Sequence, residues 1–411
     1  MPQRLTIAVI GCGTAGQAAA ILLARAGHDV TIFERSATLG PVGAGLLLQP
    51  TGMAVLDRLG VLHDMLELGE RIDHLRGIAA GGRTVLDLTY AYLQPDLFGL
   101  GVHRGALFTV LDRAVAASGA GVVTATDIAR IDNSRLIEKS GGVHGPYDLV
   151  IVADGARSSL RAASGLVQRD RVYPWGALWA VARMPDTGFD ATLSQVYRDT
   201  REMVGFLPSG RVRPGDQGRT ISMFWSVRMR DLDAIRAAGL DECKHRILRL
   251  APHAAPIVEQ IHSMDRLISA EYRDVVLSRS HSGSTTFLGD AAHAMSPQLG
   301  QGANLALLDA AALADALDRE PDLQAALAQA DRARRDNVRF YQFASRWLTP
   351  WFQSGHRALA LPRDLLLAPV ARIPWARRQM LSSLSGTRTG LFSDMQLPDA
   401  NTDGARRRPS P

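Results

Sequence analysis

Cysteine and lysine are nearly absent from this chain of 411 residues. The two cysteines, Cys12 and Cys243, lie far apart in the sequence, which excludes a disulfide framework and a cysteine-based zinc site, and we expect no metal site. So little cysteine suits a reducing compartment, and we expect a cytoplasmic protein. Lysine occurs only at Lys139 and Lys244, and this one-sided use of arginine indicates coding bias rather than a function.

Long runs of residues of one kind, either charged or uncharged, are also scarce. The formal net charge is +5, but the basic residues are dispersed and only residues 406–408 form a run, so we expect no nucleic acid partner. Residues 5–24 carry no charge and could be read as a signal peptide or a membrane anchor. Three glycines within that stretch favour a buried strand and its crossover helix instead.

The glycines that matter most stand in a strand-turn-helix motif at residues 6–16. Gly11 allows a tight turn, Gly13 lets the backbone approach a pyrophosphate, and Gly16 lets the helix pack close to the strand. Glu34 ends the next strand, where its carboxylate can accept hydrogen bonds from ribose hydroxyls. The order of these parts predicts a dinucleotide cofactor whose pyrophosphate lies at the helix N-terminus.

Two later segments also end a strand at a turn suited to a ligand. Residues 147–159 run from an apolar strand into Asp154, and Arg157 follows at the start of a helix. Residues 284–293 form a second strand that ends at Asp290, where a carboxylate can bind a polyol. A buried aspartate without such partners would be costly, so both turns are predicted to face a polar ligand.

A glycine-rich loop and a helix follow Asp290. Pro297 and Gly300 give a loop whose backbone can lie against a flat ring, and a helix is predicted from about Gly302 to about residue 317. The first N–H groups of that helix would stabilise negative charge on a ligand. His293 is next to the strand end, where an imidazole usually serves structure, and an acid–base role for it stays open.

At these three motifs the chain resembles the flavin-dependent aromatic hydroxylases, the family typified by para-hydroxybenzoate hydroxylase and salicylate hydroxylase. The resemblance covers most of residues 4–345. It implies that the first motif holds the ADP part of FAD, that Asp290 binds the ribityl chain, and that the segment at Asp154 serves both FAD and NAD(P)H. Arg104 matches a further family arginine that contacts FAD, and residues 43–45 lie where the family runs backbone past the isoalloxazine edge. The FAD-binding residues expected from the motifs and the resemblance are Gly11, Gly13, Thr14, Ala15, Gly16, Glu34, Arg35, Gly43, Ala44, Gly45, Arg104, Asp154, Arg157, Gly289, Asp290, Pro297, Gly300, Gly302, Ala303 and Asn304.

The activity implied by the resemblance is that of an FAD-dependent monooxygenase that consumes NADH or NADPH and O2. Such an enzyme hydroxylates an aromatic or polyketide-like small molecule through a flavin C4a-hydroperoxide. The chain lacks a redox cysteine pair and a second GxGxxG, a GGR soon after Glu34, and a Trp-x-Trp-x-Ile-Pro segment. These absences argue against disulfide reductases, amine oxidases and flavin halogenases respectively. A flavin-dependent reductase or dehydrogenase on the same scaffold stays open, and so does an FAD-retaining binding protein.

The expected fold class is α/β, with a Rossmann-like FAD-binding domain, an inserted mixed or antiparallel β-sheet domain for substrate, and a C-terminal helical region. Strands rich in β-branched and aromatic residues, bounded by turn residues, indicate the inserted sheet. The expected boundaries are 1–71, 99–171 and 280–340 for the FAD-binding domain, 72–98 and 172–279 for the substrate domain, 341–395 for the C-terminal helices, and 396–411 for a disordered tail.

No catalytic residue is identified, but several side chains are candidates for the substrate pocket. They are Gln49, Tyr197, Met223, Trp225, His293 and Pro297. For the strand residues among them, simple packing of the sheet is the competing interpretation.

Helices are predicted at 340–347, at 351–367 with a break at Pro362, and at 371–384. Their tryptophans Trp347, Trp351 and Trp375 could mark a membrane-facing or dimer-forming surface, although packing against the FAD domain is favoured. We therefore expect an aromatic small molecule as partner, no membrane apart from possible peripheral contact by these helices, and a monomer or homodimer.

Overall fold

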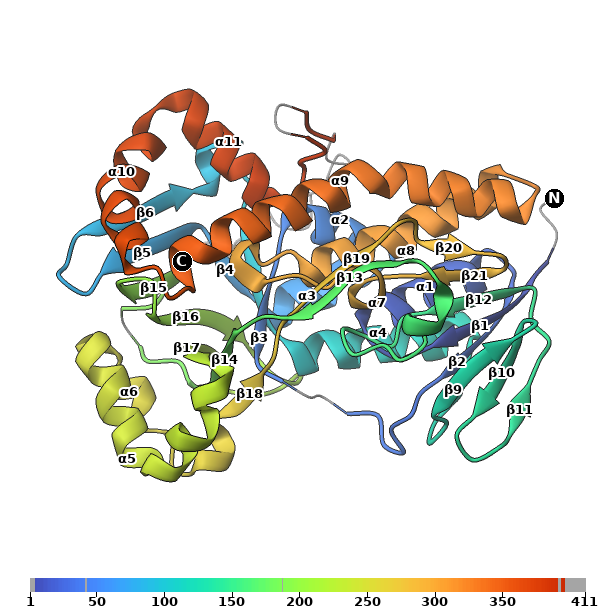
Figure 1. Cartoon of the computed structure of the whole chain (residues 1–411), viewed down its shortest axis with the longest axis horizontal. Helices are drawn as coiled ribbons and strands as arrows, with labels where there is room; N and C mark the ends of the chain where they lie inside the picture. Colours follow the sequence, from blue (N-terminus) through green and yellow to red (C-terminus); the bar gives the residue numbers. More distant parts are fainter. Residues whose placement is uncertain (1–3, 41–42, 187, 391–392, 396–411) are drawn as a thin grey trace.

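The computed structural model describes residues 4–40, 43–186, 188–390 and 393–395, and the expected tail at 396–411 lies outside these residues. Figure 1 shows a first half that contains the N-terminal strand-turn-helix motif, a second half built on a large sheet, and a long helix, α9 (Leu323–Phe352), that runs along both. This arrangement confirms the expected fold class: an α/β fold with a Rossmann-like half, an inserted mixed sheet and C-terminal helices. The exact domain boundaries remain a prediction.

The first half is organised around a six-stranded sheet, of which the strands other than β20 are parallel to one another. Its strands, in spatial order, are β20 (His281–Ser282), β21 (Thr285–Phe287), β12 (Leu149–Val152), β1 (Thr6–Ile10), β2 (Asp29–Phe33) and β8 (Gly121–Val123). The central strands β1 and β12 are apolar because both faces of the sheet are covered.

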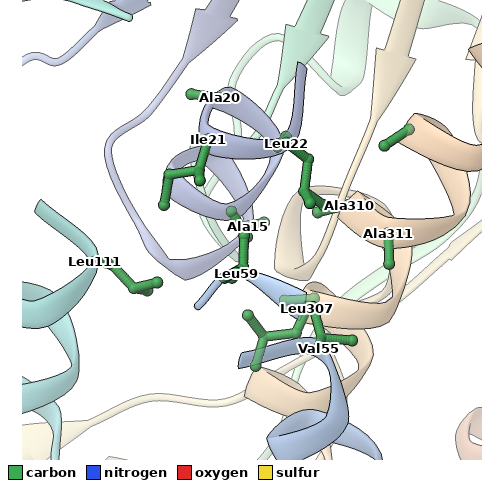
Figure 2. Close-up of a cluster of buried hydrophobic side chains, with 14 of the residues drawn as sticks. Ala15, Ala20, Ile21, Leu22, Val55, Leu59, Leu111, Leu307, Ala310 and Ala311 are labelled. Atoms are coloured by element: carbon green, nitrogen blue, oxygen red, sulfur yellow. The ribbon is translucent and has the colours of Figure 1, made fainter. Parts of the chain in front are cut away.

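Helices α1 (Thr14–Arg25), α4 (Arg104–Ser118) and α8 (Gly302–Arg319) cover one face of this sheet. Small residues on α1 and α8, such as Ala15 and Ala310, let the two helices approach closely, and Leu22 and Leu307 fill the space beside them (Figure 2). The other face is covered by the antiparallel strands β9 (Ile128–Asp132), β10 (Arg135–Glu138) and β11 (Val143–His144).

A small three-stranded sheet leads from the first half to the second. Its strands are β3 (Gly45–Leu48), β7 (Gly99–His103) and β4 (Glu70–Ile72), and helices α2 (Pro50–Arg58) and α3 (Leu62–Leu68) connect β3 to β4. The Gly45 N–H donates a 2.7 Å hydrogen bond to Ser222 Oγ of the large sheet. A Cβ at Gly45 would lie 2.2 Å from Ser209 Oγ, so only glycine permits β3 to approach the large sheet this closely.

The large sheet has seven strands and is antiparallel except for the pair β15 and β5. In spatial order the strands are β18 (Ile268–Ala270), β14 (Trp175–Arg183), β17 (Thr220–Arg228), β16 (Glu202–Gly210), β15 (Thr192–Arg198), β5 (His74–Ala79) and β6 (Thr84–Thr89). One face packs against α5 (Leu232–Leu250) and α6 (Ala255–Val258). A two-stranded ribbon of β13 (Val167–Val172) and β19 (Arg273–Leu277) joins the two halves.

The C-terminal region consists of helices α9 (Leu323–Phe352), α10 (Ala360–Arg372) and α11 (Pro374–Ser385). The expected break at Pro362 is wrong, because Pro362 lies in the first turn of α10, where a backbone N–H has no partner within the helix. Within 351–367 the helix is instead interrupted earlier, because α9 ends at Phe352 and α10 begins at Ala360. None of the described helices is both long and apolar enough to cross a bilayer.

Candidate active site

A cavity of about 1630 Å³ lies between the nucleotide-binding half, the large sheet and the C-terminal helices. Residues from all three sequence motifs line it, together with residues 43–45 and Arg104. Typical small-molecule pockets measure roughly 300–1,000 Å³. The cavity is therefore large enough for an extended cofactor and a second ligand.

The turn after β1 has the geometry that a dinucleotide requires. Gly11 has φ of 104°, and a Cβ there would lie 2.5 Å from the Ala153 carbonyl oxygen. A Cβ at Gly16 would lie 2.0 Å from the Gly11 carbonyl oxygen. Gly13 lines the cavity with open space around its Cβ position, and no side chain caps α1. The first N–H groups of α1 are thus available to a pyrophosphate.

These glycines allow a matched pair of substitutions. Gly16→Ala should lower the free energy of unfolding by about 3 kcal/mol, because the new methyl group meets backbone that cannot rotate away. Gly13→Ala should change it by less than about 1 kcal/mol, since nothing lies within 4 Å, but should weaken FAD binding about tenfold by crowding the pyrophosphate. Urea denaturation and fluorimetric FAD titration measure the two effects, and equal stability of the two variants would contradict the prediction.

Glu34 is held for hydrogen bonding at the end of β2. Its Oε2 accepts from the Cys12 N–H and its Oε1 from the Ser36 N–H, both at 2.9 Å. A carboxylate has about four acceptor sites, so two remain for ribose hydroxyls. Arg35 and Arg157 lie exposed at the rim of the cavity.

Several polar atoms along the cavity are buried and lack a hydrogen-bond partner. They include Asp154 Oδ1, Ser296 Oγ, Gln301 Oε1 and Gln49 Nε2. Burial raises the pKa of Asp154 above its ordinary value, against smaller opposing effects of Ser158 and nearby arginines. Buried polar atoms are normally paired. The chain therefore fits a ligand that carries hydroxyl, amide and carbonyl groups along its length, as FAD does.

Asp290 begins the short helix α7 (Asp290–His293), and its side chain lines the cavity. Gly289 has φ of 59°, and a Cβ there would lie 3.1 Å from Ala15 Cβ and 3.2 Å from Ala306 Cβ. The close packing of Gly289 between α1 and α8 thus brings Asp290 to the dinucleotide turn, where a ribityl chain would pass.

A buried ionic network fixes this turn from behind. His293 Nε2 lies 2.5 Å from Asp309 Oδ2, Arg334 Nε lies 2.8 Å from Asp309 Oδ1, and the Gly289 N–H donates to Asp309 Oδ2 at 2.9 Å. His293 is buried and does not line the cavity, so its expected place among the pocket candidates is wrong. Burial alone would lower the pKa of His293, but the charge and hydrogen bond of Asp309 outweigh burial and raise it.

The N-terminus of α8 faces the cavity. Gly302 and Ala303 line the cavity, and no side chain caps the helix. Its positive end would stabilise negative charge on the pyrimidine edge of a flavin. The expectation that Asn304 itself contacts the cofactor is wrong, because the side chain is buried behind the wall. Its Oδ1 accepts from the Gln49 N–H at 2.8 Å and its Nδ2 donates to the Leu47 carbonyl oxygen at 3.2 Å.

The remaining predicted residues fall into two groups. Gly11, Gly16 and Gly289 shape the turns without lining the cavity. The predicted residues that do line it are Gly13, Thr14, Ala15, Glu34, Arg35, Gly43, Ala44, Gly45, Gln49, Arg104, Asp154, Arg157, Tyr197, Asp290, Pro297, Gly300, Gly302 and Ala303. Their direct roles toward a cofactor or substrate remain predictions.

The far end of the cavity is an aromatic chamber floored by the large sheet. Trp179, Phe224 and Tyr197 line this floor, and Trp179 pairs in register with Phe224. The expectation that Met223 and Trp225 line the chamber is wrong. Both lie on the opposite face of β17, in the core beneath α5.

Sequence reasoning missed several lining residues. They include Trp179, Gln195, Phe224, Tyr272, Gln298 and Gln353. A signal existed in β17, where Phe224 stands between Ser222 and Ser226: this more polar face of the strand borders the chamber, whereas the continuous apolar face packs in the core.

A cavity that joins a dinucleotide turn to an aromatic chamber is the architecture of flavin-dependent monooxygenases, and the chain is an enzyme of this class. Residues 4–337 match the family described as FAD binding domain, and the chain belongs to that family. It also belongs with the flavin-dependent aromatic hydroxylases, as the three motifs predict. FAD is its cofactor, and NAD(P)H and O2 are the reactants that these monooxygenases require.

Two relatives show the range of the family. The 3-amino-4-hydroxybenzoate 2-monooxygenase of Streptomyces cremeus is 32% identical over 333 residues, which cover 77% of this chain and 79% of that protein. The 2-heptyl-3-hydroxy-4(1H)-quinolone synthase of Pseudomonas aeruginosa is 28% identical over 334 residues, covering 75% and 80%.

Among solved structures, a tetrameric form of 2-methyl-3-hydroxypyridine-5-carboxylic acid oxygenase superposes with a TM-score of 0.74 at 22% identity. The match covers 92% of this chain and 96% of that one, and it shows that the two proteins share a fold.

Proposed function

We propose that this enzyme hydroxylates a flat, largely apolar aromatic or heteroaromatic compound that already carries an electron-donating oxygen or nitrogen. The observation that carries the proposal is the continuity of one cavity from the dinucleotide turn to a chamber walled by aromatic and aliphatic side chains. The related enzymes named above act, by their names, on an aminohydroxybenzoate and a quinolone, which are rings of this kind.

When bound, FAD would supply the oxygenation chemistry, in which NAD(P)H gives two electrons, one oxygen atom of O2 is added to the ring and the other leaves as water. The protein itself positions the substrate ring and keeps water out of the site. Trp179 and Phe224 on the sheet, and Phe340 and Leu348 on α9, exclude water from the space where the substrate ring would lie. The N-terminus of α8 supplies fixed positive potential at the other end of the flavin site.

The two tyrosines of the chamber, Tyr197 and Tyr272, are neutral donors and acceptors at physiological pH, and the charged residues Arg363 and Glu271 line the cavity near them. Burial raises the pKa of Tyr272 to about 12 and raises that of Tyr197 further. Neither phenol can act as a base near pH 7, and the described residues that line the cavity include no histidine or lysine. These tyrosines therefore bind the substrate by hydrogen bonds without deprotonating it, and the proposal requires a ring that already carries an electron-donating group.

A substrate screen tests the proposal. The purified protein, with NADH or NADPH in air, is given simple phenols, aminophenols, hydroxyquinolines and polycyclic phenols. We expect one group to accelerate NAD(P)H oxidation and to yield a product heavier by one oxygen atom. Conversion that proceeds equally well without oxygen would overturn the proposal and favour a reductase.

Tyr272 provides a specific prediction about substrate binding. Its oxygen accepts from Trp179 Nε1 at 3.3 Å, so its own hydrogen can be donated into the chamber. Tyr272→Phe should raise KM for the substrate about three- to tenfold, the effect of one hydrogen bond, with FAD content unchanged. Tyr173→Phe is the matched control, because Tyr173 does not line the cavity, and identical KM values in the two variants would refute the assignment.

A further inference from the structure

The outer face of α10 and the start of α11 is apolar yet exposed. From residue 361 to residue 375, the exposed residues are Leu361, Leu365, Leu366, Pro369, Val370, Arg372, Ile373, Pro374 and Trp375. Arg372 is the one charged residue among them. Leu361 is 66% exposed, Leu366 58% and Ile373 53%. A run of large exposed apolar residues on adjacent turns marks an interaction surface rather than ordinary solvent-facing helix.

This surface adjoins the entrance of the cavity. Leu366 and Val370 line the cavity and are also exposed, as are Phe343 and Trp347 on the neighbouring helix α9. Figure 1 shows α10 and α11 at one end of the molecule, above β5 and β6. The cavity therefore opens to the outside beside the apolar surface, between α9 and α10.

The charges on α10 and α11 are mostly positive, and the neighbouring strand β6 contributes one exposed aspartate, Asp87. Residues 357–388 contain six arginines and one acidic residue, Asp364. Asp364 pairs with the buried Arg363 and leaves the outer arginines without acidic neighbours on these helices. Arg372 and Arg378 are exposed, and the Arg377 guanidinium lies 3.9 Å above the centre of the exposed Tyr92 ring. These arginines and Tyr92 form a fringe around the apolar face. An apolar face surrounded by aromatic and arginine side chains is complementary to the headgroup region of an anionic bilayer.

A second copy of the chain is a less suitable occupant. In a symmetric dimer this surface would face itself, so the outer arginines of both copies would be brought together. Like charges at close range oppose such an association. A lipid surface supplies the negative charge that the fringe lacks.

We propose that α10 and the start of α11 dock this protein on an anionic membrane surface, with the cavity entrance against the acyl region of the lipid. Docking in this orientation would let an apolar aromatic substrate pass from the bilayer into the chamber without crossing water. The docking proposal depends only on the properties of this exposed surface, whereas the delivery of substrate rests on the function proposed above.

Vesicle flotation of the FAD-loaded protein, without any substrate, tests the docking. Vesicles of phosphatidylcholine mixed with phosphatidylglycerol should carry the protein upward, and vesicles of phosphatidylcholine alone should carry much less. The variant with Leu361→Gln, Leu365→Gln and Ile373→Gln should bind about tenfold or more weakly, because three apolar side chains no longer enter the interface. None of the three lines the cavity, so FAD content should be unchanged.

Two further variants make the result specific. Val143→Gln is the matched control, because Val143 is 54% exposed on β11, at the opposite end of the molecule in Figure 1, and it should float like the parent protein. Arg372→Gln combined with Arg378→Gln should weaken binding to anionic vesicles and leave the residual binding to neutral ones unchanged.

Two outcomes overturn the proposal. One is a parent protein that stays at the bottom of the gradient with both kinds of vesicle. The other is a parent protein that sediments as a dimer where the triple variant is a monomer and that does not float, which would assign the surface to a second copy. Because flotation needs no turnover, failure to find a substrate would affect the proposed function and leave the docking result standing.

Discussion

Asp290→Ala yields, in our expectation, a folded protein that has lost most of its yellow colour. Asp290 lines the cavity at the turn that packs between α1 and α8, where a charged acceptor can bind ribityl hydroxyls. A hydrogen bond to a charged group contributes about 1.5–3 kcal/mol, so FAD affinity should fall about ten- to hundredfold. Fluorimetric titration of FAD into the apoprotein measures the change.

Asp318→Ala is the matched control for this variant. Asp318 is an exposed aspartate on α8 that does not line the cavity, so its removal should leave FAD affinity unchanged. An Asp290→Ala variant that keeps full FAD occupancy after dialysis would contradict the ribityl role.

Asp309→Ala should have the largest effect on stability. The substitution leaves His293 and Arg334 buried without their shared carboxylate and removes the acceptor of the Gly289 N–H. Breaking a buried ion pair by removing one partner costs about 3–5 kcal/mol. Urea denaturation should show a loss of this size, and Asp318→Ala should again have no effect.

The pH dependence of that loss follows from the two perturbed groups. Burial opposes ionisation of Asp309, but His293 and Arg334 outweigh it and lower its pKa from 3.8 to about 2, so its contribution is present above pH 3.8 and is lost as pH falls through 2. The pKa of His293 is raised above 6.5, so its contribution is full below pH 6.5 and is lost as pH rises through the raised value.

The difference in unfolding free energy between the parent protein and the Asp309→Ala variant should therefore be greatest between about pH 4 and pH 6.5. Denaturation curves across that range measure it. A difference that stays constant from pH 3 to pH 9 would show that the network is not ionic.

The nucleotide half of the site was open to prediction because its chemistry is local in sequence. Gly11, Gly13 and Gly16 act within one turn, and Glu34 follows directly after the next strand. The turns at Asp154 and Asp290 could be found for the same reason. Each stands at the end of an apolar strand that enters the sheet beside β1 or β12.

The substrate-binding half of the site was harder to predict because its residues depend on which face of a strand is covered by a helix. In β17, Met223 and Trp225 alternate with Phe224, and all three side chains are buried or half-buried. The covering helix α5 comes later in the chain and selects the Met223 face for the core. Sequence pattern alone gives the alternation but does not say which side meets the helix.

Contacts between elements that are distant in the sequence could also not be predicted from the sequence pattern. The network of His293, Asp309 and Arg334 joins three helices, and Asn304 uses its side chain to hold β3 and α8 together. A polar residue in a glycine-rich loop looks the same in sequence whether it binds a ligand or the backbone behind it. Burial in the folded chain separates the two roles.

The parallel pairing of β15 with β5 sets the order in which the enzyme can be assembled. His74 pairs with Thr192, so the hairpin of β5 and β6 leaves the ribosome well before the strand that receives it. Until β15 has been synthesised, the edge of β5 that later pairs with β15 is unpaired, and the hairpin has no sheet to join. In a chain whose synthesis stops before β15, that unpaired strand edge would be free to pair with other molecules. The wall of the chamber can therefore form only late in synthesis.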